Sequence, residues 1–301
     1  MTAVTRILVP PGIGDIYWVL VKLRGLASRY NWARPELTVV TQPDPMNRHL
    51  HSVPYLEMFD WFDIGDPSTV ANATAHNNVW EEGYSVNGRP VFENIQGYDA
   101  FISYNGRLNN GGYLEDDSLP CEWHPMMSAS TETAIQAAKS AYENVFGRDA
   151  VVLYFPFYGS YINYEREFPI STMATAINKF TSNTALLPVV VGAAWDDNAM
   201  MQNLLNRIDR PYINLLGKTD LSQVFAVLRA ARIVIGYQAG PVQLAAGNGK
   251  KTLLLWDGRF HDNMMYSIVP PDVRGTSYRA LKTAGLTADT CLDALMDLYV
   301  Q

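Results

Sequence analysis

The pair Gly240-Pro241 stands where a buried strand passes into a helix, and this placement suits the binding of an anion. The β-branched run Ile233-Val-Ile235 precedes it, and the strand-like run 252–256 follows. A helix N-terminus offers unpaired N–H groups and about half a positive charge, which favours phosphate. Gly240 leaves room for close approach, and Pro241 fits a first turn that has no use for its missing N–H. The pattern predicts an anion cradle; an ordinary strand-to-helix turn is the alternative.

A second group able to do chemistry is Asp15, which follows the turn Pro10-Pro-Gly-Ile-Gly14. It stands at the start of an amphipathic run that reaches Tyr30. A carboxylate in this place is either a helix cap, worth about 0.5–2 kcal/mol, or a general base for an incoming hydroxyl. Position alone favours the helix cap.

Further polar groups lie in loops of the second half. Arg166 belongs to the polar loop Tyr164–Pro169, and Lys218-Thr219 lie between a strand and a helix. Asp196 follows a strand that ends at Gly192, where it either contacts a ribose or caps a helix. Cys121 and His124 are too sparse for a metal site, and the remaining Asp residues read as loop or cap residues. We therefore predict no metal.

The elements that must position these groups alternate between strands and helices. In the first half, strands are predicted at 6–9, 37–41 and 98–104, with a helix over 15–30. Long loops are expected near 65–95 and 109–117. In the second half, strands are predicted at 151–155, 186–191, 212–216, 233–235 and 252–256, and helices at 131–146, 171–180, 197–208, 220–231, 241–247 and 287–299. This alternation predicts the α/β class, with two Rossmann-like domains whose parallel sheets face across a cleft.

Composition narrows the function classes. The chain has 301 residues, 48% of them hydrophobic, and a formal net charge of −7. This acidic balance disfavours a general nucleic-acid binder. No run is long enough to span a membrane, and no apolar leader is expected. With two cysteines far apart, we expect a reducing cytoplasm.

The ordered motifs resemble one known family. The segments LLGKTDL (215–221) and RIVIGYQAGPVQLAAGNGKKTLLLW (232–256) are similar to the C-terminal half of glycosyltransferase family 9, the ADP-heptose:lipopolysaccharide heptosyltransferases. Arg166-Glu-Phe-Pro169 resembles the family's Lys-x-Trp-Pro, and ILVPPGIGDIYWVL resembles its strand-x-x-Gly-Asp opening. The match is good at 210–256 and weak at 45–130.

The resemblance implies a metal-independent, inverting glycosyltransferase of the GT-B fold. An acceptor-side domain would span 1–147, and a domain that binds the nucleotide-sugar would span 148–301, with its last helix packing back on the first domain. Asp15 matches the family's base, and Arg166 matches its phosphate-binding Lys; these are the implied catalytic residues. The nucleoside-diphosphate sugar is a co-substrate, and no cofactor is expected. The residues implied to bind the donor are Gly12, Gly14, Ser160, Asp196, Lys218, Thr219, Gln238, Ala239, Gly240 and Gln243.

The sequence also departs from the family. Gln238-Ala239 replace its Asp-Thr/Ser, and Gln243 replaces its His, so heptose and ADP stay open as sugar and carrier. The acceptor is a lipopolysaccharide core, another glycan or a hydroxylated DNA base, the last disfavoured by the charge. Alternatives are an isomerase resembling the nucleotide-sugar 2-epimerases and an inactive sugar-nucleotide-binding protein. A dehydrogenase is disfavoured because the full G-x-G-x-x-G spacing is missing.

Overall fold

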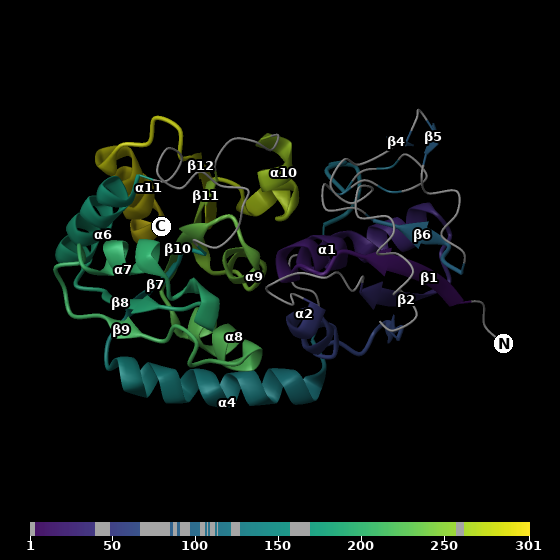
Figure 1. Cartoon of the computed structure of the whole chain (residues 1–301), viewed down its shortest axis with the longest axis horizontal. Helices are drawn as coiled ribbons and strands as arrows, with labels where there is room; N and C mark the ends of the chain where they lie inside the picture. Colours follow the sequence, from purple (N-terminus) through teal and green to yellow (C-terminus); the bar gives the residue numbers. More distant parts are fainter. Residues whose placement is uncertain are drawn as a thin grey trace. The chain divides into compact units, whose positions relative to one another are not determined.

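A computed structural model gives the three-dimensional structure (Figure 1). It describes residues 4–39, 49–66, 85–86, 89–90, 97–102, 106, 108, 112, 114–121, 127–156, 169–256 and 262–301. The chain divides into two compact units, Met1–Thr131 and Glu132–Gln301. Each unit is built around a parallel sheet, as the alternating strands and helices predict.

Unit 1 contains a four-stranded parallel sheet in the order β3-β2-β1-β6 among its described residues. The strands are β1 (Val4–Val9), β2 (Arg34–Val39), β3 (Asp63–Ile64) and β6 (Ala100–Phe101). Helix α1 (Ile13–Arg29) follows β1, and helix α2 (His49–Leu56) lies between β2 and β3 in the chain. A separate antiparallel hairpin joins β4 (Ser85–Val86) and β5 (Arg89–Pro90).

The described residues of unit 2 form a six-stranded parallel sheet in the order β12-β11-β10-β7-β8-β9. The strands are β7 (Ala150–Tyr154), β8 (Leu187–Val190), β9 (Ile213–Asn214), β10 (Ile233–Tyr237), β11 (Lys251–Trp256) and β12 (Tyr278–Lys282). The helices are α4 (Ala129–Phe146), α6 (Ile170–Thr184), α7 (Ala199–Leu205), α8 (Leu221–Ala230), α9 (Gly240–Gly247), α10 (Asp262–Ser267) and α11 (Ala288–Val300). Two short 3-10 helices cover Ala194–Asp196 and Pro271–Val273.

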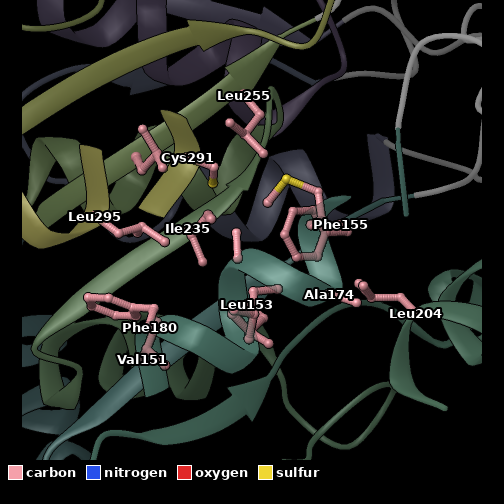
Figure 2. Close-up of a cluster of buried hydrophobic side chains, with 14 of the residues drawn as sticks. Val151, Leu153, Phe155, Ala174, Phe180, Leu204, Ile235, Leu255, Cys291 and Leu295 are labelled. Atoms are coloured by element: carbon pink, nitrogen blue, oxygen red, sulfur yellow. The ribbon is translucent and has the colours of Figure 1, made fainter. Parts of the chain in front are cut away.

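The core of unit 2 explains why its strands were readable from sequence. Val151, Leu153, Ile235 and Leu255 point from the strands toward the helices α6, α7 and α11 (Figure 2). These strands are nearly continuous apolar runs, as expected for a parallel sheet buried on both faces. Helix α11 packs on α6 and β11, and α8 and α9 pack together beside β7, β10 and β11.

Both sheets reverse their strand order at a first strand. In unit 2 the chain moves outward from β7 to β8 and β9, then returns to place β10 on the other side of β7. In unit 1 it moves from β1 to β2 and β3, and β6 lies on the other side of β1. In open parallel sheets, ligands bind outside the carboxyl ends of the strands at such a switch point. The fold therefore directs attention to the ends of β7 and β10 and to the end of β1.

Candidate functional site

Helix α9 begins at the switch point of unit 2. Ala239 is its N-cap, with extended backbone angles (φ −162°, ψ 166°), and Gly240 and Pro241 start the helix. The Gln238 N–H donates to the Leu255 carbonyl at 2.7 Å, so this amide belongs to the sheet. The helix start therefore lies directly after the strand, where the sequence predicts an anion cradle.

Gly236 brings this helix start close to β7. In the sheet register Gly236 lies opposite Tyr154, the last residue of β7. A Cβ at Gly236 would overlap the Tyr154 carbonyl oxygen and would lie 2.6 Å from Val242 Cγ2. A glycine inside a strand often marks such a close backbone approach. The run Ile-Val-Ile-Gly-Tyr carries this signal, although Gly236 is not among the site residues predicted from the sequence.

Gln243 presents a buried oxygen near the first turn of α9. Its side chain is 6% exposed, and its Oε1 has no hydrogen-bond partner among the described residues. A helical side chain leans toward the N-terminus of its helix, so the amide covers the turn that begins at Gly240. A buried acceptor left unpaired costs about 1–3 kcal/mol. A ligand hydroxyl or N–H at this place would remove that cost.

Asp196 presents a second unpaired oxygen after β8. One carboxylate oxygen, Oδ2, accepts the Ala193 N–H at 2.9 Å, and within the part of the chain that the structure describes Oδ1 has no hydrogen-bond partner. The side chain is 1% exposed, and this burial raises its pKa to about 6, while hydrogen bonds from the Ala193 N–H and the Tyr154 side chain act in the opposite direction. Asp196 therefore caps the 3-10 helix Ala194–Asp196, which is one of the two roles that the sequence allows, and its Oδ1 is still available to a ligand.

The loop after β9 holds Lys218 and Thr219. Gly217 has φ +64°, and the Gly217 N–H donates to the Gly192 carbonyl at 2.9 Å, which joins this loop to the loop after β8. Lys218 is exposed, and its Nζ donates to the Asn214 carbonyl at 2.9 Å. Thr219 Oγ1 is buried, and no described residue forms a hydrogen bond with it.

The unpaired oxygens of Asp196, Thr219 and Gln243 share one edge of the sheet. They belong to residues that follow β8, β9 and β10, at the strands' carboxyl ends. Two buried hydroxyls elsewhere in unit 2 are paired: Thr181 donates to the Ile177 carbonyl and Ser267 to the Met264 carbonyl. Because buried polar atoms in folded proteins nearly always have partners, this edge is suited to a ligand that carries several hydrogen-bond donors.

Asp15 lies at the switch point of unit 1. Gly12 is the N-cap of α1 (φ −83°, ψ 135°), and Asp15 is the third helical residue, partly exposed. The N-cap role considered for Asp15 is therefore wrong, because the helix begins earlier in the turn. A Cβ at Gly12 would overlap Asp15 Oδ2 and lie 3.2 Å from Asp15 Cγ. The carboxylate thus occupies the space that a side chain at Gly12 would fill. Gly14 lies in the same first turn.

Two predicted site residues, Ser160 and Arg166, lie outside the described residues. Tyr154 and Ser52 were not predicted, although both contact site elements. Tyr154 lies within the predicted strand 151–155 and ends the observed strand β7, so its position was readable. The Ser52 hydroxyl contacts the Pro11 carbonyl across 41 residues, and no local pattern signals such a contact.

The described part of the chain offers neither a metal centre nor a membrane span. There, no three His, Cys, Asp or Glu side chains gather where they could hold a metal ion. Within the same residues, none of the helices combines the length and apolar character needed to cross a membrane. Cys121 and Cys291, the two cysteines of the chain, are not joined in a disulfide bond.

Comparisons with known proteins agree with this geometry. Residues 157–259 match the family model described as Glycosyltransferase family 9 (heptosyltransferase). This segment includes β8, β9, β10 and α9, and therefore the edge with the unpaired oxygens. The match confirms the resemblance that the motifs predict. A search of curated proteins gives no match.

Solved structures are similar over the whole chain. A family 9 glycosyl transferase from Veillonella parvula DSM 2008 is 13% identical with a TM-score of 0.61, and the alignment covers 99% of this chain and 97% of that one. The E. coli ADP-heptose lipopolysaccharide heptosyltransferase II is 16% identical with a TM-score of 0.61, covering 99% of both chains. E. coli heptosyltransferase WaaC, solved with ADP, is 12% identical with a TM-score of 0.53, covering 98% and 100%. At these identities the likeness establishes the fold, and it confirms the predicted GT-B architecture.

Proposed function

We propose that this chain, a glycosyltransferase with a family 9 segment at 157–259, moves a sugar from a nucleoside-diphosphate donor to an acceptor hydroxyl with inversion and without a metal. The observation that carries the proposal is the edge of unit 2, where the start of α9 lies in the same switch-point region as unpaired buried oxygens. A helix start suits a diphosphate, and unpaired acceptors suit ribose and sugar hydroxyls. The similar WaaC structure was solved with ADP, which supports a nucleotide as part of the donor.

The donor roles follow from the chemistry of each group. The diphosphate would lie against Ala239 and Gly240, where fixed backbone dipoles stabilise the charge that grows as the glycosidic bond breaks. Arg166 would pair with the same diphosphate through its two-pronged guanidinium. Gln238 and Gln243 would bind the phosphate or the sugar, and Asp196, Lys218 and Thr219 would contact the nucleoside. We assign this donor domain to residues 148–301.

Asp15 would act as the general base. Inversion requires a base that takes the proton of the acceptor hydroxyl on the face opposite the leaving diphosphate. Asp15 is supported in this role by its place at the end of β1, by its partial exposure and by its match to the family's Gly-Asp turn. Gly12 and Gly14, beside it at the start of α1, would contact the donor. We assign the acceptor side to residues 1–147 and the reaction to the cytoplasm, in keeping with two cysteines that are not joined in a disulfide bond.

A panel assay tests the proposal. The protein is incubated with a set of nucleotide-sugars and candidate glycan acceptors, with a chelator present throughout, and both nucleotide release and the anomeric configuration of the product are measured. We expect release with one donor class, unchanged by chelator, and an inverted product. No turnover with any pair, a retained configuration or strict dependence on added metal would each contradict the proposal.

A second candidate is a binding protein without turnover, favoured by the neutral Gln238-Ala239 in place of the family's Asp-Thr/Ser. Under this alternative a nucleotide-sugar raises the melting temperature, because a ligand that binds only the folded state stabilises it. No product forms, and the Asp15→Ala variant binds the donor as the wild type does.

A further inference from the structure

A buried serine outside the candidate site contacts the turn that holds Asp15. Ser52 lies in α2 with a fully buried side chain, and its hydroxyl donates to the Pro11 carbonyl oxygen. Helical hydroxyls commonly bond the carbonyl one turn back, as Thr175 does to Ser171 and Thr184 to Phe180. The Ser52 bond joins positions 41 residues apart. It ties α2 to the turn between β1 and α1.

The Pro11 carbonyl belongs to the peptide that leads into Gly12. Peptide units are planar, so fixing the carbonyl oxygen also fixes the direction of the Gly12 N–H on the other side of the plane. Pro11 has a fixed φ, which leaves little other freedom in this residue. A single hydrogen bond at Pro11 therefore determines how the backbone enters Gly12.

Gly12, which has no side chain, in turn leaves the space that the Asp15 carboxylate occupies. Its carbonyl accepts the Ile16 N–H at 2.9 Å, which begins α1. The Asp15 carboxylate occupies the space beside the Gly12 Cα, where a Cβ would overlap Oδ2. Any tilt of the Pro11–Gly12 peptide therefore changes the position of Gly12 and of the carboxylate that packs against it.

We infer that Ser52 is a positioning residue for Asp15, because its hydroxyl holds the Pro11–Gly12 peptide in the orientation that leaves room for the carboxylate beside Gly12. The inference rests on the proposed role of Asp15 as general base. It adds a residue from a separate helix whose fully buried side chain is assigned no contact with donor or acceptor. A misplacement of about 1 Å is enough to reduce turnover strongly when a reacting group must be aligned.

The test compares Ser52→Ala and Ser52→Cys with a matched control, Ser267→Ala. Ser267 is also fully buried, and it donates to a backbone carbonyl at 2.9 Å in unit 2. Sugar transfer is measured together with deuterium exchange of the peptide that covers residues 12–16. We expect Ser52→Ala to lower kcat about tenfold with the donor KM unchanged, and to speed exchange of that peptide. Ser52→Cys keeps the volume and a weak donor, so its kcat should lie between those of the alanine variant and the wild type.

Three outcomes are decisive. Equal kcat and equal exchange in folded Ser52→Ala and wild-type protein would overturn the inference, as would an equal loss of kcat in Ser267→Ala. A fall in kcat that the cysteine variant does not partly restore would also contradict it. The Asp15→Asn variant separates the role of Ser52 from that of the base. If that variant keeps full turnover, the proposed base is wrong; if it is inactive while Ser52→Ala is unaffected, only the role of Ser52 fails.

Discussion

The two units share the strand order around their first strand but carry different groups at the switch point. In unit 1 the helix at the switch point follows the first strand, β1, and its first turn holds a carboxylate. In unit 2 the helix α9 follows β10, the fourth strand of its sheet in chain order. Two of the polar groups at this edge, Thr219 and Gln243, are neutral, and the third, the Asp196 carboxylate, accepts a backbone N–H through its other oxygen. The glycines differ in the same way. Gly12 makes space for the Asp15 side chain, whereas Gly236 makes space for the Tyr154 backbone.

This difference teaches that the consequence of replacing a glycine depends on what lies beside it, a side chain at Gly12 and a strand backbone at Gly236. A side chain can rotate away from an added methyl group, but a carbonyl in a sheet cannot. Substitutions in unit 1 should therefore affect turnover more than stability, and the matched substitution in unit 2 should affect stability first.

Asp15→Asn should give the largest effect. The amide keeps the shape of the side chain but cannot accept the proton, so kcat should fall about 10²- to 10⁴-fold. Donor affinity should stay unchanged because the donor is assigned to unit 2. Steady-state kinetics with the best donor from the panel measure both quantities. If the variant keeps more than half of the wild-type turnover, Asp15 is not the general base and the catalytic role assigned to unit 1 is wrong.

Gly236→Ala should destabilise the protein by about 3 kcal/mol, because the methyl group overlaps the Tyr154 carbonyl oxygen and crowds Val242. Urea denaturation followed by circular dichroism measures the free energy of unfolding. Gly12→Ala serves as the matched control in unit 1. Equal stability of Gly236→Ala and the wild type would show that the close approach of β10 to β7 is not a constraint.

Asp196 should make stability fall as the pH rises from about 4 to 6. Its pKa is raised from 3.8 to about 6 in the folded state, so within this window the folded protein binds a proton that the unfolded chain has released. The free energy of unfolding should decrease by about 2 kcal/mol across the window and stay lower above it. In Asp196→Asn this slope should disappear. Urea titrations at several pH values compare the two proteins, and identical slopes would contradict the burial of a carboxylate as the cause.

Gly12→Ala should lower kcat about tenfold with little change in melting temperature. The backbone of Gly12 (φ −83°) suits alanine, so the conflict is confined to the Asp15 carboxylate. Displacing a reacting group by a fraction of an ångström is expected to cost about this much. Kinetics and a thermal melt on the same sample give both numbers. A large loss of stability with normal turnover would reverse the contrast with Gly236.

The sequence predicted most of the fold of unit 2, because buried parallel strands read as apolar runs and helices follow at regular intervals. Helix α9 and its start were readable from Gly240-Pro241 alone. Helix α2 and strand β12 were not predicted. Pro54 lies inside α2, and a proline argues against a helix interior when only the sequence is read.

The site was predictable only where the chemistry is local. The turn before Asp15 and the start of α9 each lie within a few residues of the chain. The raised pKa of Asp196 depends on burial by tertiary packing, and the contact of Ser52 with Pro11 joins two distant segments. Neither the packing around a side chain nor a long-range hydrogen bond leaves a periodic signal in the sequence.

The central claim concerns where unit 2 holds the diphosphate. A crystal structure of the wild-type chain with a bound nucleoside diphosphate tests it most directly. We expect phosphate oxygens against the backbone of Ala239 and Gly240, with ribose hydroxyls on the edge that carries Asp196 and Thr219. Phosphates that contact neither Ala239 nor Gly240, at a site away from the ends of β7 and β10, would contradict it.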